Sequence, residues 1–260
     1  MILTAGNYFS PEANREYMSV SQYKSFETCQ EMAMAEIEGK WQRPMSTALL
    51  VGSYVDAHFE GTLDIFRAQH PEIIKKDGNL KSEYQQADEI IGRLERDRLF
   101  MDYMSGRKQV ILSGEIAGVK IKIKVDVLHP DKIVDLKIMR DFAPVWVEGV
   151  GRLPWFEAWR YDLQGAVYQE IVRQATGQQL PFYLCAGTKE AVPDLDIIHI
   201  RQDVLDFELE RFAGNVGTYA AIKQELIPPE RCGKCDWCKF TKVLSVPTES
   251  DEYNDEVVED

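Results

Sequence analysis

With 260 residues, 45% of them hydrophobic, the chain can bury a sizeable core, which predicts a single α/β domain over residues 1–247. No segment is apolar for long enough to span a membrane, and the first residues lack the basic and apolar stretches of a signal peptide, so we expect a soluble cytoplasmic protein. The net charge of −13 argues at first against a polyanionic partner, yet seven acidic residues fall within positions 249–260. We expect residues 248–260 to form a disordered acidic tail.

The first half of the chain is predicted to be helical, and its centre to form strands. Apolar periodicity predicts helices at residues 21–39, 48–66 and 81–103, followed by a strand at 108–116. Alternating apolar and polar residues at 119–126 predict a half-buried strand with Asp126 on its polar face. The turn chemistry of residues 128–132 then leads into a second strand at 133–138. The two strands are therefore expected to form a hairpin.

The second half returns to mixed elements. A loop rich in Trp and Pro at residues 142–155 precedes a long helix predicted at 156–176, which Gly177 ends. Strands are predicted at 182–187 and 195–200, and a last helix at 202–225. Internal repeats are absent from the sequence.

The hairpin carries the side chains that metal-dependent phosphodiester cleavage needs. Asp135 lies in an otherwise apolar run, where burying a carboxylate is costly unless a cation or a partner receives it. Asp135 and Lys137 are two residues apart and therefore share one face of the strand. The hairpin can close Asp126 and Asp135 onto one divalent cation, with Lys137 placed to orient or deprotonate a water and to neutralise charge on a phosphate.

Several of these residues also have ordinary structural explanations. Taken alone, Asp126 is more often a solvated turn residue than a ligand. Lys120, Lys122 and Lys124 share the face of Asp126, where they create either a local positive potential for a phosphate or a solvated lysine face.

Two helical features complete the candidate site. The imidazole of His58 could be a further metal ligand, although a lone histidine is more often a hydrogen-bonding residue. Gln164 and Tyr168 are four residues apart and point the same way along a helix. One can hydrogen-bond a phosphate or the attacking water and the other can stack on a nucleotide, although such pairs are also common on half-buried helices.

The cysteines predict a second metal site. Cys232, Cys235 and Cys238 follow one another at two-residue gaps, a pattern that packing does not explain in a protein expected to be intracellular. Cys29 is the natural fourth ligand if the chain ends meet, whereas Cys185 is more simply a buried small residue. Four thiolates suit a [4Fe–4S] cluster or structural Zn²⁺, and spacing does not decide between them. We favour the cluster, because a compact triplet with one remote cysteine is a common way to wrap a cubane.

These features, in this order, resemble the PD-(D/E)XK nuclease superfamily, specifically its RecB-like and RecE-like exonuclease branches, over residues 19–242. That family's site combines an early helical His, an Asp on one core strand, an Asp-x-Lys on the next and a Gln-x-x-x-Tyr helix. The matching residues are His58, Asp126, Asp135 with Lys137, and Gln164 with Tyr168. Val125 stands where the name of the motif has proline.

The resemblance implies a restriction-endonuclease-like core, a mixed central sheet flanked by helices. It implies Mg²⁺ or Mn²⁺ held by His58, Asp126, Asp135 and the backbone carbonyl of Leu136, with Lys137 assisting the attacking water. The early cysteine followed by a late cysteine triplet looks like the iron–sulfur nucleases of the superfamily.

The function that the resemblance implies is a metal-dependent DNA exonuclease of the phage RecE type, which degrades one strand of linear duplex DNA and hands the product to a single-strand annealing protein. A CRISPR-adaptation-type exonuclease trimming single-stranded ends and a catalytically silent DNA-binding module are the alternatives. A homo-oligomer is also left open, because related recombination exonucleases form rings around DNA.

Overall fold

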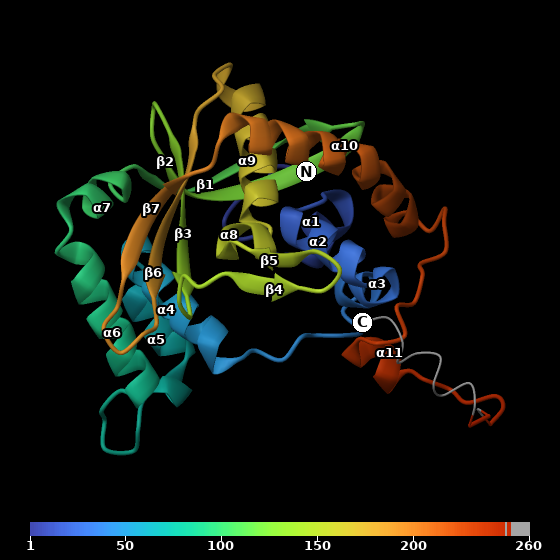
Figure 1. Cartoon of the computed structure of the whole chain (residues 1–260), viewed down its shortest axis with the longest axis horizontal. Coiled ribbons are helices and arrows are strands. Elements are labelled where there is room, and N and C mark those ends of the chain that lie inside the picture. The colour runs from blue at the N-terminus through green and yellow to red at the C-terminus, as the bar shows by residue number, and fades with distance from the viewer. Residues whose placement is uncertain (248, 251–260) are drawn as a thin grey trace.

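A five-stranded mixed sheet forms the centre of the protein in the computed structural model, which describes residues 1–247, 249 and 250 (Figure 1). The acidic tail expected at 248–260 therefore lies almost wholly outside the described residues. The strand order is β1-β2-β3-β6-β7, in which only the β3–β6 pair is parallel. The strands are β1 (Arg107–Ile116), β2 (Val119–Leu128), β3 (Ile133–Met139), β6 (Phe182–Thr188) and β7 (Leu195–His199).

Helices cover both faces of this sheet (Figure 1). In chain order they are α1 (Pro11–Glu16), α2 (Val20–Thr28), α3 (Gln30–Ile37), α4 (Thr47–Glu60), α5 (Leu63–Gln69), a 3-10 turn (Pro71–Ile73), α6 (Ser82–Glu95), α7 (Arg98–Tyr103), α8 (Trp155–Ala158), α9 (Tyr161–Thr176), α10 (Gln202–Lys223) and α11 (Asp236–Phe240). One face packs on α9, which α10 and α2 cover in turn, and the other packs on α4 and α6. This mixed sheet with flanking helices confirms the predicted fold class. None of the described helices is long and apolar enough to cross a membrane.

The two faces carry separate cores, and β3 contributes to both. Ile133 packs in the core on the α9 side, while Val134 and Leu136 pack in the core on the α4 side. Because side chains alternate along a strand, Asp135 and Lys137 project toward α9. The apolar alternation of β3 thus aims the two charged residues at the helix that carries Gln164.

Four of the predicted helices are interrupted. The helix expected at 21–39 breaks at Cys29, whose backbone is extended (φ −166°, ψ 114°), so this cysteine lies between helices and not on one. Gly61 ends α4 in a left-handed conformation, and Asp97 starts α7 by accepting a hydrogen bond from a backbone N–H with its side chain. Arg160 takes φ 57° between α8 and α9. These breaks redirect the chain where apolar periodicity continues, which is why periodicity alone does not locate them.

Further short elements were not predicted, α11 among them. The loop expected at 142–155 contains a short antiparallel ribbon of β4 (Val145–Val147) and β5 (Gly151–Leu153). Near the start of the chain, Ser10 caps α1 with its side chain and Pro11 occupies the first helical turn.

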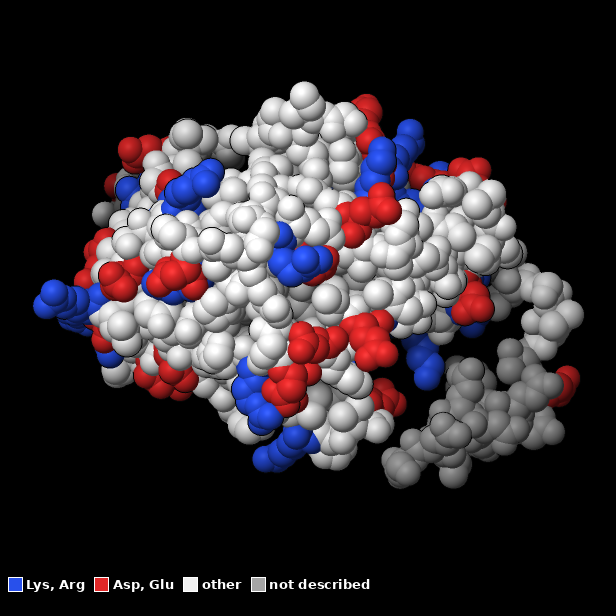
Figure 2. All heavy atoms as spheres, turned by 90° about the horizontal axis from the view of Figure 1, so that it is seen from above, with Lys and Arg blue, Asp and Glu red and all other residues white. Residues whose placement is uncertain are grey.

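Two lysines of β2 contact the N-terminal segment, whereas the third, Lys124, lines the cavity described below. Lys122 is 1% exposed, and its ammonium donates to the Tyr8 carbonyl (2.5 Å) and to Asn14 Oδ1 (2.7 Å). Burial lowers the pKa of Lys122 to about 8. Lys120 pairs with Glu16 at 2.9 Å. Lys120 and Lys122 therefore hold the N-terminal segment against the sheet. On the face seen in Figure 2, basic and acidic side chains are interspersed.

Candidate active site

Strands β2 and β3 separate within the sheet, and Asp126 fills the gap. The two strands pair at only two positions, Val127 with Val134 and Leu128 with Ile133. Beyond them, Asp126 Oδ2 accepts a hydrogen bond from the Leu136 backbone N–H at 3.0 Å.

This hydrogen bond also orients the neighbouring carbonyl. The N–H and C=O of one strand residue point to the same edge, so the Leu136 carbonyl is directed toward the same gap. On the other side, Gln109 Nε2 of β1 donates a hydrogen bond to Asp126 Oδ1 at 3.4 Å. The backbone of Gln109 has a positive φ of 52°. The carboxylate is therefore oriented from both neighbouring strands.

Asp135 is the most enclosed carboxylate of the site. It is 1% exposed, and Oδ1 accepts a hydrogen bond from Gln164 Nε2 at 2.7 Å. Its Oδ2 is paired with the ammonium of Lys137. Burial, with a smaller contribution from Asp126, raises the pKa of Asp135 above its ordinary value. Burial alone would lower the pKa of Lys137, but Asp135 and Asp126 outweigh it and raise that pKa.

A third carboxylate, Asp56, enters the site from α4. It lines the same cavity as Asp126 and Asp135, and burial followed by the charge of Asp126 raises its pKa well above the ordinary value. Its signal in the sequence is weak: one acidic residue between the apolar residues Val55 and Ala57. Sequence reasoning instead selected His58 from the same helix.

The structure does not bring His58 to these carboxylates. Side chains two residues apart on an α-helix are rotated by about 200° about the helix axis, so His58 and Asp56 lie on nearly opposite sides of α4 and cannot face the same cavity. His58 Nε2 lies 2.8 Å from Glu95 Oε1 on α6, and the histidine is absent from the cavity lining. Its position corresponds to the ordinary alternative of a hydrogen-bonding histidine.

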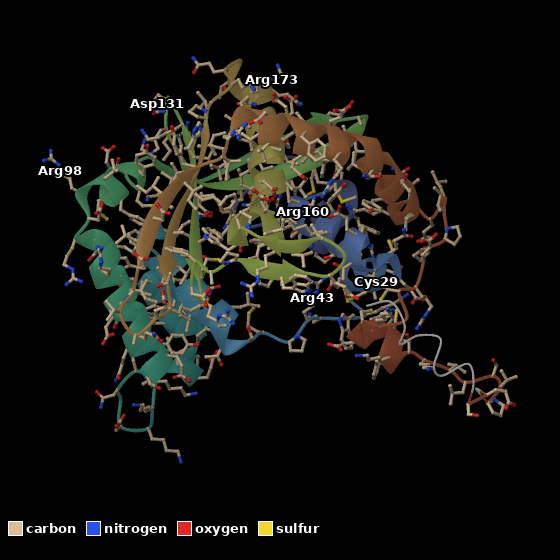
Figure 3. All side chains as sticks on the ribbon, viewed as in Figure 1. Cys29, Arg43, Arg98, Asp131, Arg160 and Arg173 are labelled. Atoms are coloured by element: carbon tan, nitrogen blue, oxygen red, sulfur yellow. The ribbon has the colours of Figure 1, made fainter. Side chains whose placement is uncertain are left out.

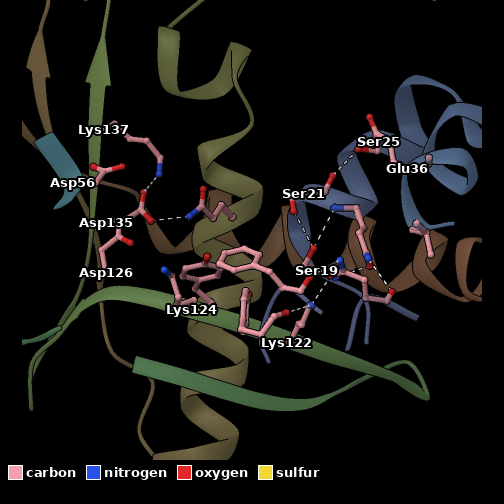
Figure 4. Close-up of a pocket in the computed structure, with 18 of the residues that line it drawn as sticks. Ser19, Ser21, Ser25, Glu36, Asp56, Lys122, Lys124, Asp126, Asp135 and Lys137 are labelled. Carbon is pink, nitrogen blue, oxygen red and sulfur yellow. Dashed lines mark hydrogen bonds and ion pairs between the residues drawn. The ribbon is translucent and has the colours of Figure 1, made fainter. Parts of the chain in front are cut away.

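The cavity has a volume of about 410 Å³ and lies between the sheet, α9, the α2–α3 pair and the N-terminal segment. Figure 4 shows Asp56, Asp126, Asp135 and Lys137 gathered at one end of it. Hydroxyl groups of α2 and its cap lie toward the other end, together with Lys122. The lining residues that could take part in catalysis or metal binding are Asp56, Asp126, Asp135, Leu136, Lys137, Gln164 and Tyr168.

Gly165 brings α9 close enough to the sheet for this arrangement. A Cβ atom at Gly165 would lie 2.5 Å from Cδ1 of Phe182 on β6. The missing side chain therefore allows Gln164 to reach Asp135. One turn further, Tyr168 also lines the cavity, and burial raises its pKa well above the ordinary value, so the phenol is a neutral hydrogen-bonding group.

The structure brings the four cysteines of the predicted second site together. The Sγ atoms of its four members lie within 4.8 Å of one another, and Cys185 is not among them. In Figure 3, Cys29 lies beside α3 and α11, where the early and late parts of the chain meet. The backbone N–H of Cys235 donates to Cys232 Sγ at 3.3 Å and lowers the pKa of that thiol to about 6. The residues of the group are Cys29, Cys232, Cys235 and Cys238.

Comparison with known proteins places the chain in a family. Residues 19–241 match the model of the PDDEXK-like domain of unknown function (DUF3799). The chain belongs to this family. Among solved structures, it is similar to the crystal structure of a protein from Eubacterium rectale named "putative exonuclease", with 46% sequence identity, a TM-score of 0.94 and 99% of each chain covered. No curated protein matches significantly.

The residues that match the family include all the elements that carry the site. In this PDDEXK-like chain, β2, β3 and α9 supply five side chains selected from the sequence, and all five line one cavity. Asp56 joins them from α4, and Gln109 supports them from β1. The five are Asp126, Asp135, Lys137, Gln164 and Tyr168.

Proposed function

We propose that the protein is a divalent-metal-dependent DNA exonuclease acting on linear double-stranded DNA. The observation that carries this proposal is the convergence of Asp126, Asp135 and Lys137 in one cavity, at the point where β2 and β3 separate. Two carboxylates and an ammonium in this arrangement serve hydrolysis of a phosphodiester better than they serve packing, because burying them without a substrate or a cation is costly.

The chemistry of the cavity lining supports the proposal of a hard cation. Burial raises the pKa values of Asp56 and Asp135, and repulsion from Asp126 adds to the rise, so a positive ion among them would relieve both effects. All the donors are oxygens, which Mg²⁺ and Mn²⁺ prefer. We assign the ligands as Asp56, Asp126, Asp135 and the Leu136 carbonyl, with Asp56 in the place expected for His58. When bound, the cation would polarise the phosphate and acidify a water.

The protein side chains divide the remaining work. The ammonium of Lys137 is charged and lies at the Asp135 carboxylate, where it can hold the attacking water and neutralise charge on the phosphate. The side-chain amide of Gln164 holds Asp135 in place. The neutral phenol of Tyr168 can donate a hydrogen bond to a phosphate oxygen.

The exonuclease class is supported by the relative from Eubacterium rectale, whose name includes "exonuclease". A role in phage-type recombination, with a single-strand annealing protein as partner, is the finer proposal and rests on the sequence resemblance. Trimming of single-stranded ends and DNA binding without cleavage are alternative outcomes of the same experiment.

The experiment is digestion of linear duplex DNA, carrying a different label at each end of one strand, beside a closed circle of the same sequence. Reactions contain Mg²⁺, Mn²⁺ or EDTA, and a single-stranded oligonucleotide is run in parallel. We expect metal-dependent loss of the linear duplex alone, and the label that disappears first gives the polarity. Cutting of the circle would contradict the exonuclease proposal, and binding without cleavage in both metals would contradict catalysis.

A pair of lysine variants connects this result to the site. Lys137→Ala removes the ammonium from the cavity and should abolish digestion. Lys76→Ala removes an exposed lysine from the loop before α6 and should leave digestion unchanged. Equal rates in the two variants would exclude the cavity as the active site.

A further inference from the structure

The separation of the four cysteine sulfurs bears on which metal the group would hold. Two of the sulfur–sulfur distances are 3.6 Å, between Cys29 and Cys238, and 4.0 Å, between Cys232 and Cys238. All four Sγ atoms lie within 4.8 Å of one another. A single ion bound to four thiolates at about 2.3 Å holds the sulfurs about 3.8 Å apart, the edge of the tetrahedron.

A [4Fe–4S] cluster requires a wider arrangement. Each cysteine binds a different iron of the cubane, so the iron–iron edge adds to the iron–sulfur bonds and the thiolates stand about 6 Å apart. Even the widest separation in this group, at most 4.8 Å, is shorter than that. The sulfur separations are therefore closer to those around a single ion than to those around the cubane that we favoured from the sequence. The spacing of cysteines along the chain does not show how far apart their sulfurs lie.

We propose that Cys29, Cys232, Cys235 and Cys238 bind one Zn²⁺ ion in a tetrahedral structural site. The loop backbone is shaped for thiolates: the Cys235 N–H donates to Cys232 Sγ at 3.3 Å and the Cys238 N–H to Cys235 Sγ at 3.4 Å. Gly233, with φ 74°, makes the turn between the first two ligands. Such hydrogen bonds orient ligands and stabilise their charge.

The surroundings give the site a structural role. The four cysteines would fill all four coordination positions of the ion. The aromatic side chains of Trp41, Trp237 and Phe240 pack together beside them. The same junction is reinforced outside the cluster, where Arg231 pairs with Glu31. The ion would therefore lock the late part of the chain onto the start of α3.

Helix α3 connects the four-cysteine group to the cavity. Ala33, Glu36 and Ile37 of that helix form part of the cavity wall, one to two turns beyond Cys29. Release of the ion should loosen this wall, although no cysteine of the group lines the cavity. The zinc proposal itself does not depend on the proposed nuclease activity.

The test is the metal content of the full chain after expression with both iron and zinc supplied and purification without oxygen. Elemental analysis should give one zinc per chain, with no acid-labile sulfide and no visible absorption. Replacement of zinc by Co²⁺ should produce the strong thiolate charge-transfer bands and tetrahedral d–d bands of a four-sulfur site. About four irons and four sulfides per chain would overturn the proposal. So would a chain that retains no metal and gives no cobalt spectrum.

Two alanine variants locate the ion. Cys29→Ala should lose the zinc and the four-sulfur cobalt spectrum, and should melt at a lower temperature. Cys185→Ala removes an equally buried thiol outside the group and should keep one zinc per chain. Zinc retained at full stoichiometry in Cys29→Ala would contradict the assignment. If Cys29→Ala does not fold, the metal content and cobalt spectrum of the wild type and Cys185→Ala decide the matter.

Discussion

The carboxylate of Asp126 accepts a hydrogen bond from the backbone N–H of Leu136 at 3.0 Å. In a continuous sheet the neighbouring strand would bind this N–H with a backbone carbonyl. One residue thus ends the pairing of β2 with β3 and stands at the metal site that we propose. The hydrogen bond needs only an oxygen acceptor, whereas a cation needs the negative charge. The two roles can therefore be separated by substitution.

Asp126→Asn should keep the fold and lose activity. The amide oxygen can still accept from Leu136, so we expect the melting temperature to change little, while DNA digestion in Mg²⁺ falls about 100-fold or more. Initial rates of nucleotide release and a thermal melt of the same preparation check both parts. A digestion rate near that of the wild type would remove Asp126 from the ligand set.

Asp56→Asn and His58→Asn distinguish the two candidate ligands of α4. Asp56 lines the cavity, so its substitution should lower the rate and raise the Mg²⁺ concentration needed for half-maximal activity. His58 contacts Glu95 instead, so its substitution should leave the Mg²⁺ titration unchanged. Titration of the digestion rate with Mg²⁺ measures both. The opposite pattern would restore the histidine ligand implied by the family resemblance.

Gly165→Ala should separate α9 from the sheet. The added methyl would meet Phe182 Cδ1 at 2.5 Å, and relief of this overlap is expected to cost about 1–3 kcal/mol of unfolding free energy. The displacement also weakens the hydrogen bond from Gln164 to Asp135, so activity should fall.

Gly214→Ala is the matched control for this change. It lies on α10 with nothing within 4 Å of the added Cβ, and alanine should stabilise the helix by about 0.5–1 kcal/mol. Urea unfolding of both variants gives the comparison. Equal stability of the two would show that the sheet accommodates the methyl at Gly165.

Lys223 should make stability rise with pH. Its ammonium donates to the Tyr17 carbonyl and to Gln22 Oε1, and burial, followed by repulsion from Lys122, lowers its pKa to about 7 from the ordinary 10.5. Between these values the unfolded chain binds a proton that the folded chain lacks. The unfolding free energy therefore increases with pH, by at most about 1.4 kcal/mol per pH unit.

The check is urea unfolding at pH 7 and pH 9 for the wild type and Lys223→Met. The variant should show a smaller rise between the two pH values, because the ionisable group is gone. Part of the rise should persist, since burial lowers the pKa of Lys122 in the same direction. Identical slopes in the two proteins would mean that Lys223 titrates normally in the folded state.

Much of the site could be predicted because strands have a simple periodicity. Alternation along β2 and β3 placed Asp126, Asp135 and Lys137 near one another, and the spacing of Gln164 and Tyr168 put both on one face of α9. The structure brings all five to one cavity. For these residues, local pattern and tertiary arrangement agree.

Other features depend on contacts between distant segments, which periodicity does not contain. Both Asp56 and His58 suit a helix, and only the packing of α4 against the sheet decides which one meets the carboxylates. Lys122 looks like a surface residue in the sequence, yet the N-terminal segment buries it. The extended backbone of Cys29 follows from its place beside the late cysteines, about 200 residues away along the chain.

The single parallel pair of the sheet bears on the order of folding. Strands β1 and β2 are joined by a two-residue turn and can pair early, whereas β3 meets β6 only after β4, β5, α8 and α9 have been laid down between them. Closing that long connection costs more chain entropy than closing a hairpin, and contacts between distant residues form slowly. We therefore expect Asp135 and Gln164 to meet late in folding, so that nascent or partly folded chains are unable to cut DNA.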